Sequence, residues 1–352
     1  MLLIPCMKVL ITGSSGQIGT NLASALLRNG REVLGLDCRP NQWTAEFETQ
    51  LVDLVAVARG KAAYEPPFRP DVIVHLAAHA KVHDLVLNPA RALENVEMAA
   101  AVFEMGRLAK SPVIFGSSRE VYGDIEQHVT DESMADFVVA KSPYSASKIA
   151  GEALLYSYAR CYDLPMLVFR FSNVYGRYDN DLDRMERVIP LFVRKIYDGV
   201  PITVYGREKM LDFTYVDDCV SGLMAGISGL AEGRLVNQTL NLAYGQGQTL
   251  SDLVTLIELA TGRKAKATFE PARAGEVTRY IADISKAAKL LGYRPQTPLT
   301  AGIVKYLDWL RQTGWLDQHG AQPGRARSRI PKGAPRVDRV PRELATPRAS
   351  SK

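Results

Sequence analysis

The sequence predicts an α/β fold in which a doubly wound parallel sheet is followed by a smaller C-terminal α/β lobe. Short apolar runs that end in small or polar residues are typical of buried parallel strands. Such runs occupy residues 8–12, 32–37, 71–76 and 112–118. Helical patterns separate them, which indicates strand–helix–strand units. We expect a first domain at 7–172, to which 212–242 returns, and a second lobe in the rest of 173–318.

The composition is that of an ordinary globular protein, with 47% hydrophobic and 23% charged residues among 352. No apolar run has membrane-spanning length, and the apolar start lacks a basic signal-peptide region, so we expect a cytoplasmic protein. The four cysteines are widely spaced, which favours free thiols in a reducing compartment and predicts no metal site.

The net charge of +5 comes from the C-terminal end of the chain. Residues 319–352 hold nine Lys or Arg and two acids, and the remainder is slightly acidic. Five prolines and few large apolar residues predict that this basic tail is disordered. The overall charge therefore gives no argument for nucleic-acid binding.

A glycine-rich turn joins the first strand to the first helix, at Gly13, Gly16 and Gly19. Glycines let the backbone approach a pyrophosphate, and the helix N-terminus offers free N–H groups to the anion. Asp37 ends the next strand, where a carboxylate binds ribose hydroxyls. The acid would repel a 2′-phosphate and favours NAD over NADP, although Arg39 is near enough in sequence to bind that phosphate. This unit predicts a Rossmann-type dinucleotide site.

Tyr144 and Lys148 are four residues apart in a helical pattern, so both side chains lie on one helix face. An ammonium beside a phenol lowers the pKa of the phenol, which predicts a proton-transfer pair. Ser118 ends an apolar strand, and ligands of open parallel sheets lie beyond such strand ends.

Together, the glycine spacing, Ser118 and the Tyr144–Lys148 pair resemble the extended short-chain dehydrogenases/reductases. The resemblance spans residues 7–312 and is strongest to the NAD-dependent nucleotide-sugar epimerase/dehydratase branch, the UDP-glucose 4-epimerase-like enzymes. It implies that Tyr144 removes a proton from a sugar hydroxyl while hydride passes to NAD. It also implies that Lys148 holds the nicotinamide ribose and that Ser118 hydrogen-bonds the same hydroxyl.

The resemblance implies further contacts for the cofactor and for the substrate. For NAD, besides Tyr144 and Lys148, they are Gly13, Gly16, Gln17, Ile18, Gly19, Asp37, Asp53, Leu54, Leu76, Ala77, Ala78 and Asn95. For the nucleotide sugar, besides Ser118, they are Asn173, Tyr205, Arg207 and Arg273. Leu211 stands where the family usually has a phosphate-binding arginine, and Arg207 or Lys209 are candidates to replace it.

The choice of reaction depends on Arg119 and Glu120, which replace the Asp-Glu pair of the 4,6-dehydratases. Arginine does not act as a general acid near neutral pH, which counts against dehydration. We expect a nucleotide-sugar 4-epimerase in carbohydrate metabolism, such as polysaccharide biosynthesis. Glu120 keeps a uronic acid decarboxylase open as a catalytic alternative, and it is equally a candidate for a structural partner of Arg119.

Two further expectations follow from the resemblance. A non-catalytic NAD-binding regulator is disfavoured because Ser118, Tyr144 and Lys148 are all present. The helices that carry Asn95 and Tyr144 usually form the dimer interface of this family, so a homodimer is expected.

Overall fold

The computed structural model describes residues 6–123, 140–272 and 277–318. Arg273 and the basic tail therefore lie outside the described residues. Seven parallel strands form the main sheet, in the order β10-β6-β5-β4-β1-β2-β3. Their bounds are β1 Lys8–Thr12, β2 Glu32–Asp37, β3 Glu48–Leu51, β4 Val72–His75, β5 Val113–Ser118, β6 Met166–Phe171 and β10 Gln238–Leu242. The sequence-based prediction of a doubly wound parallel sheet is confirmed.

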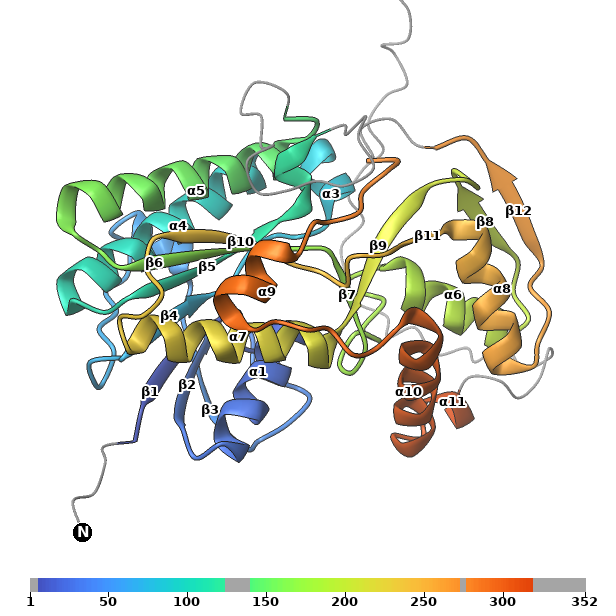
Figure 1. Cartoon of the computed structure of the whole chain (residues 1–352), viewed down its shortest axis with the longest axis horizontal. Helices are drawn as coiled ribbons and strands as arrows, with labels where there is room; N and C mark the ends of the chain where they lie inside the picture. The colour runs from blue at the N-terminus through green and yellow to red at the C-terminus, as the bar shows by residue number, and fades with distance from the viewer. Residues whose placement is uncertain (1–5, 124–139, 273–276, 319–352) are drawn as a thin grey trace, which may run out of the picture. The chain divides into compact units, whose positions relative to one another are not determined.

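Helices cover both faces of this sheet, as Figure 1 shows. They are α1 Gln17–Arg28, α2 Leu54–Ala58, α3 Val82–Leu87, α4 Ala90–Ala109, η1 Arg119–Tyr122, α5 Pro143–Tyr162 and α7 Val216–Ala231. Side chains alternate along each strand, so the two faces build separate cores. On β1, Val9 and Ile11 pack with α1 and α7, whereas Leu10 packs with α4 and α5 on the other face.

The second part of the chain adds two small sheets. Strands β7 Asn173–Tyr175, β9 Met210–Tyr215 and β11 Gly247–Thr249 form one, and β8 Ile202–Tyr205 and β12 Ala267–Glu270 form the other. The helices are α6 Val188–Tyr197, α8 Leu250–Thr261, α9 Ser285–Leu291, α10 Leu299–Gln312 and α11 Trp315–Gln318. Among the described helices, none is long and apolar enough to cross a membrane.

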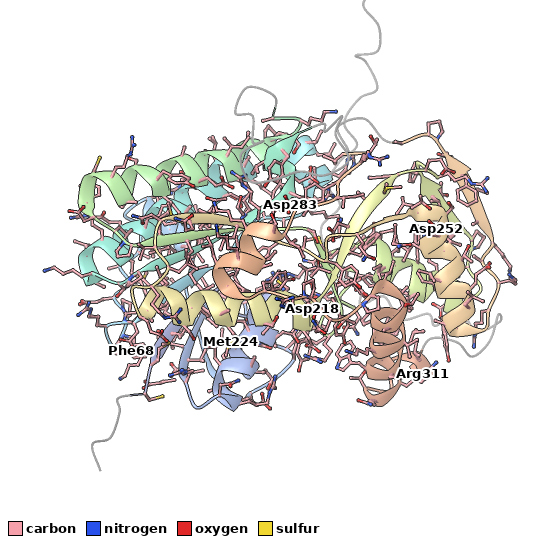
Figure 2. The ribbon with its side chains drawn as sticks, viewed as in Figure 1. Phe68, Asp218, Met224, Asp252, Asp283 and Arg311 are labelled. Atoms are coloured by element: carbon pink, nitrogen blue, oxygen red, sulfur yellow. The ribbon has the colours of Figure 1, made fainter. Side chains whose placement is uncertain are left out.

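The core on the α1 and α7 face of the main sheet continues into the second part of the chain. Strand β10 returns to pair with β6, so the chain rejoins the main sheet at residues 238–242. Asp218 on α7, labelled in Figure 2, accepts hydrogen bonds from the backbone N–H groups of Gln296 and Thr297, both 2.9 Å. This contact ties the segment before α10 to the main sheet's helix layer. The division into two lobes, with its boundaries, stays a prediction.

The order of the main sheet reverses between β1 and β4, which both continue into loops at the same sheet edge. A crevice beyond the carboxyl ends of the strands at such a switch point is where open α/β sheets bind ligands. The glycine turn follows β1, residues 76–78 follow β4, and Ser118 ends β5.

A buried ion pair joins α5 to β6 behind this edge. Arg170 donates to both oxygens of Glu152, at 2.7 and 3.0 Å, and the Ser117 hydroxyl donates to the same carboxylate at 2.6 Å. Glu152 is 1% exposed and Arg170 4%. Two desolvated charges of opposite sign therefore hold the helix that carries Tyr144 against the sheet.

We predict that Glu152→Ala lowers the free energy of unfolding by about 3–5 kcal/mol, because it leaves the Arg170 charge buried without its carboxylate. Chemical denaturation measures the change. The matched control is Asp308→Asn, which removes an exposed ion pair with Arg311 on α10 (Figure 2) and should cost less than about 1 kcal/mol. Equal losses in the two variants would contradict the assigned role of the buried pair.

Candidate active site

The glycine turn is packed too tightly for side chains at two of its positions. Gly13 has a φ of +73°, and a Cβ there would lie 2.7 Å from the backbone nitrogen of Ala77. A Cβ on Gly19 would lie 2.3 Å from the Gly13 carbonyl oxygen. Helix α1 starts beyond Gly16 with no side-chain cap and no acid in its first turn. Its N–H groups and its positive dipole end are therefore suited to the pyrophosphate of a dinucleotide.

Asp37 is fixed at the rim of this turn. Its carboxylate accepts hydrogen bonds from the backbone N–H groups of Ser15 and Arg39, both at 3.1 Å. The Ser15 hydroxyl in turn donates to the Arg39 carbonyl at 2.9 Å. The acid thus lies at the end of β2, beside the turn, where the sequence predicts it for the cofactor's ribose.

The next predicted cofactor residues have structural roles of their own. Asp53 is exposed and caps α2, since its carboxylate accepts from the N–H groups of Val55 and Ala56. Leu54 is buried in the core beneath α4. Cofactor contacts at Asp53 and Leu54 stay predictions.

The loop after β4 is held by Asn95 of α4. The Asn95 side-chain oxygen accepts from the N–H of His79 at 2.7 Å, and its nitrogen donates to the His79 carbonyl and to the Ser147 hydroxyl, both at 3.1 Å. Asn95 therefore fixes the loop that contains Leu76, Ala77 and Ala78 relative to α5. The structure gives it a positioning role, and a direct cofactor contact stays a prediction.

Helix α5 presents the predicted proton-transfer pair. Ser142 caps the helix by accepting from the Ser145 N–H at 3.1 Å, and Pro143 takes the first helical position, where a missing N–H costs nothing. The helix thereby starts at the sheet edge with Tyr144 in its first turn and Lys148 one turn later. Ser118 lies close enough to Tyr144 to lower the pKa of its phenol, so the structure brings these three side chains together.

The charge state of Tyr144 differs from the sequence-based expectation, which was a pKa lowered by Lys148. Burial raises the pKa of Tyr144 to about 12, and the nearby Ser118 side chain acts in the opposite direction. Among charged groups, Glu120 raises this pKa, while Arg187 and Arg119 lower it. In the protein alone, desolvation of the phenolate outweighs these favourable partners.

The position of the Lys148 ammonium bears on the pKa of Tyr144. Its ammonium donates to the Gly116 carbonyl at 2.7 Å and lies 5.9 Å from the centre of the Tyr144 ring. Burial lowers the pKa of Lys148 to about 8, while Glu152 opposes that shift. The lysine is thus a largely buried cation, fixed by a backbone carbonyl, one turn from the phenol.

Glu120 and Arg119 form an ion pair with 2.9 Å between nitrogen and oxygen. Both side chains are largely buried, at 8% and 12% exposed, and the Arg119 guanidinium lies 5.7 Å from the centre of the Tyr280 ring. This geometry agrees with the interpretation of Glu120 as the partner of Arg119. A catalytic role for Glu120 stays a prediction.

The predicted substrate residues are more scattered. Asn173 on β7 donates from its side chain to the Asp212 carbonyl of β9 at 2.9 Å. Tyr205 ends β8, and the Arg207 side chain beyond it is 64% exposed and stacks on Phe269. Leu211 is buried in the core. The leucine at position 211 therefore offers no charge to a substrate phosphate. That Arg207 replaces the missing arginine stays a prediction, as does the role of Arg273.

Sequence reasoning missed a charged cluster at the start of α1. Arg187 donates to the Asp179 carboxylate at 2.8 Å and also to the Gln17 side-chain oxygen. The Gln17 side-chain nitrogen is buried without a hydrogen-bond partner in the part of the chain that the structure describes. Gln17 is more than 160 positions from both Asp179 and Arg187, so no local pattern in the sequence signals the cluster.

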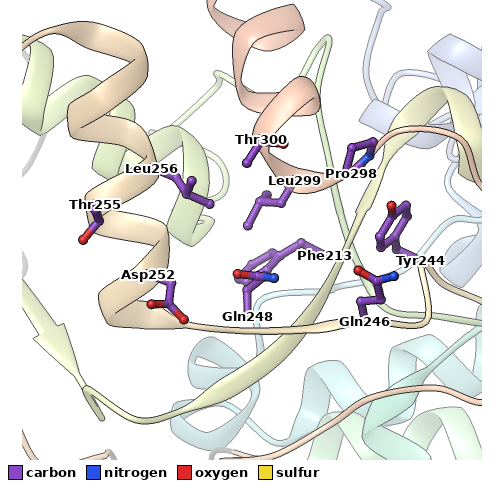
Figure 3. Close-up of a pocket in the computed structure, with 10 residues that line it drawn as sticks. All are labelled: Phe213, Tyr244, Gln246, Gln248, Asp252, Thr255, Leu256, Pro298, Leu299 and Thr300. Carbon is purple, nitrogen blue, oxygen red and sulfur yellow. The ribbon is translucent and has the colours of Figure 1, made fainter.

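A cavity of about 270 Å³ lies elsewhere, between β9, β11, α8 and the start of α10 (Figure 3). Phe213, Gln248 and Leu299 line it from three of these elements. None of the predicted site residues lines this cavity. It is therefore separate from the surface that Tyr144 and the glycine turn define.

The turn, the ribose acid and the Ser118–Tyr144–Lys148 group define a dinucleotide-dependent enzyme of the short-chain dehydrogenase/reductase class. Residues 9–242 match the model of the NAD dependent epimerase/dehydratase family, and the chain belongs to that family. The predictions of an NAD-dependent enzyme of this family and of NAD as its cofactor are confirmed.

Individual relatives agree with this assignment. The chain is 33% identical to UDP-glucose 4-epimerase of Mycolicibacterium smegmatis, over 87% of this chain and 99% of that protein. It is similar to the crystal structure of UDP-glucose 4-epimerase from Thermotoga maritima with UDP-glucose, with a TM-score of 0.79, 27% identity, and coverage of 87% and 99%. It is also similar to UDP-glucuronic acid 4-epimerase from Bacillus cereus with UDP-glucuronic acid and NAD, with a TM-score of 0.75, 26% identity, and coverage of 87% and 100%.

The buried Asp179 predicts a specific dependence of stability on pH. Burial raises its pKa from 3.8 to about 7, with Arg187 opposing. The folded protein therefore holds a proton there that the unfolded chain releases, and the associated stability is full below about pH 4 and is lost as the pH rises through 7. We predict that the wild type loses stability relative to Asp179→Asn between pH 5 and pH 8, by chemical denaturation across this range. Parallel curves for the two proteins would show that Asp179 does not titrate in this window.

Proposed function

We propose that the protein is a nucleotide-sugar 4-epimerase that oxidises the sugar 4-hydroxyl and reduces the resulting ketone on its opposite face. The observation that carries the proposal is the grouping of Ser118 beside Tyr144, with the Lys148 ammonium 5.9 Å from the Tyr144 ring and one helical turn away, at the edge of the dinucleotide turn. This is the group of side chains that a reversible oxidation of a hydroxyl requires.

Each of these side chains has a distinct task. Tyr144 as phenolate accepts the proton of the 4-hydroxyl, and Ser118 hydrogen-bonds the same oxygen as it becomes a carbonyl. The glycine turn and Asp37 would hold NAD, which would supply the hydride acceptor and donor for the sugar carbon. Burial raises the pKa of Tyr144 to about 12 although Arg119 and Arg187 already lower it. The positive charge of the oxidised nicotinamide would therefore be a further group that favours the phenolate.

The remaining predicted residues divide between cofactor and substrate. The glycine turn and Asp37 are assigned to NAD. Asn173, Tyr205 and Arg207 are assigned to the nucleotide of the substrate, for which we propose a UDP-sugar because the relatives act on UDP-glucose or bind UDP-glucuronic acid. Asp53, Leu54, Asn95 and Arg273 keep the cofactor and substrate roles that the resemblance implies.

A second candidate is a lyase of the same family, a uronic acid decarboxylase or a 4,6-dehydratase. The observation that supports this candidate is Glu120, a buried carboxylate that lies close enough to Tyr144 to raise the pKa of the Tyr144 phenol. Its ion pair with Arg119 favours a fixed charge over proton transfer, since arginine remains protonated. We therefore place the lyase second and the non-catalytic regulator third.

We also propose a homodimer through the outer faces of α4 and α5. Large apolar side chains are exposed there, with Leu93 at 67%, Leu108 at 68% and Tyr162 at 54%. Such groups on two adjacent helices are typical of a surface that another subunit covers. A cytoplasmic location and a role in polysaccharide biosynthesis stay predictions.

The products distinguish these functions. Purified protein is incubated separately with UDP-glucose, UDP-N-acetylglucosamine, UDP-glucuronate and dTDP-glucose, and each product is analysed by mass and by NMR. We predict a product of unchanged mass with inverted configuration at carbon 4 of the sugar. Loss of water or of carbon dioxide would replace the epimerase with the lyase, and no turnover by NAD-loaded protein would favour the regulator.

A further inference from the structure

Residues 177–187 run from the second part of the chain to the glycine turn. The Asn21 side chain of α1 donates to the Arg177 carbonyl, and the Gln42 side chain donates to the Asp181 carboxylate, both at 3.1 Å. The segment is therefore held against α1 at one end and against the loop after β2 further along.

Arg184 is the residue of this segment that reaches the turn itself. One of its guanidinium nitrogens donates to the Ser15 carbonyl at 3.2 Å. The other lies 4.0 Å from the place where a Cβ on Gly16 would be. The guanidinium is therefore beside the backbone that ends at the N-terminus of α1.

In the part of the chain that the structure describes, Arg184 lacks the carboxylate partner that the other arginines of this segment have. Arg177 forms an ion pair with Asp217, and Arg187 forms one with Asp179. Arg184 forms no ion pair with any carboxylate of the described residues. In the described residues its guanidinium donates to a backbone carbonyl, that of Ser15, and its remaining N–H groups are left for an anion.

Charges of both signs lie around Arg184. Burial lowers the pKa of its guanidinium, and the charge of Arg39 acts in the same direction, while Asp37 and Asp181 oppose. The first turn of α1 contains no acid, and Asp37 already accepts two backbone N–H groups. A partly buried arginine beside a helix N-terminus is an arrangement that a dianion stabilises, because both present N–H donors to it.

We propose that Arg184 is a cofactor-binding residue that binds the pyrophosphate of NAD together with the N-terminus of α1. The planar guanidinium donates two hydrogen bonds to phosphate oxygens, which a lysine cannot reproduce. Since Arg184 belongs to a segment of the second part of the chain, NAD is held by both parts, and its release requires the segment of residues 177–187 to move. This contact favours retention of one NAD through many turnovers.

The test is the exchange of bound NAD in the holoenzyme. Wild type, Arg184→Gln, Arg184→Lys and the control Arg194→Gln are purified, and the release of bound NAD into an excess of deuterium-labelled NAD is followed by mass spectrometry. Arg194 carries the same charge on α6 and pairs there with Asp198, away from the turn. Melting temperatures confirm that each variant is folded.

We predict that Arg184→Gln exchanges NAD about 10- to 100-fold faster than the wild type, the range expected for lost hydrogen bonds to a charged group. Arg184→Lys should be intermediate and Arg194→Gln unchanged. High salt should accelerate exchange in the wild type more than in Arg184→Gln, because the ionic contact is already missing in the variant.

Three results would overturn the proposal. One is wild-type exchange in folded Arg184→Gln, and another is faster exchange in Arg184→Lys than in Arg184→Gln, because the lysine keeps the positive charge that the proposal pairs with the phosphates. The third is unchanged NAD exchange with altered discrimination between NAD and NADP, which would place Arg184 at the ribose. The readout does not depend on which sugar is turned over, so its failure would leave the proposed epimerase activity untouched.

Discussion

The site depends on the close approach of the glycine turn to the end of β4. A side chain at Gly13 would meet the Ala77 backbone, and one at Gly19 would meet the Gly13 carbonyl. This contact brings the N-terminus of α1, the loop after β4 and the end of β5 to one edge of the sheet. Tyr144 reaches the same edge because Ser142 and Pro143 start α5 there. The cofactor surface and the proton-transfer pair are therefore products of one packing constraint.

The second feature of the site is that its ionisable groups, Tyr144 and Lys148, are buried away from water. Burial alone moves the pKa of Tyr144 up and that of Lys148 down, so each group is less charged than it would be in water. The protein opposes this with cations that come from separate elements, Arg119 from η1 and Arg187 from the segment before α6. A positive cofactor adds to them, which links ionisation of the phenol to the oxidised form of NAD. Proton removal and hydride transfer are in this way favoured at the same moment.

Local patterns in the sequence predicted the sheet, the glycine turn and Asp37 at a strand end, because strand ends and helical spacing are short-range properties. The grouping of Ser118 with Tyr144 and Lys148 came instead from the resemblance to the family. The direction of the Tyr144 pKa shift could not be predicted, because it depends on how deeply the fold buries the ring. The contacts of Arg184 and Arg187 were missed for a related reason, since each joins residues about 170 positions apart. A segment such as residues 177–187, which contacts the glycine turn from far along the chain, has no local sequence pattern that predicts this contact.

The central claim is that Tyr144 transfers the proton of the sugar hydroxyl. Its most direct test is the turnover of Tyr144→Phe with the nucleotide sugar that the wild type converts, measured with the NAD content of the same preparation. Tyr156→Phe, which removes another hydroxyl from the same helix, is the control. The account predicts a loss of about 10²- to 10⁴-fold in turnover for Tyr144→Phe, with NAD retained and the control close to wild type. Turnover of Tyr144→Phe within a few-fold of the wild type would contradict it.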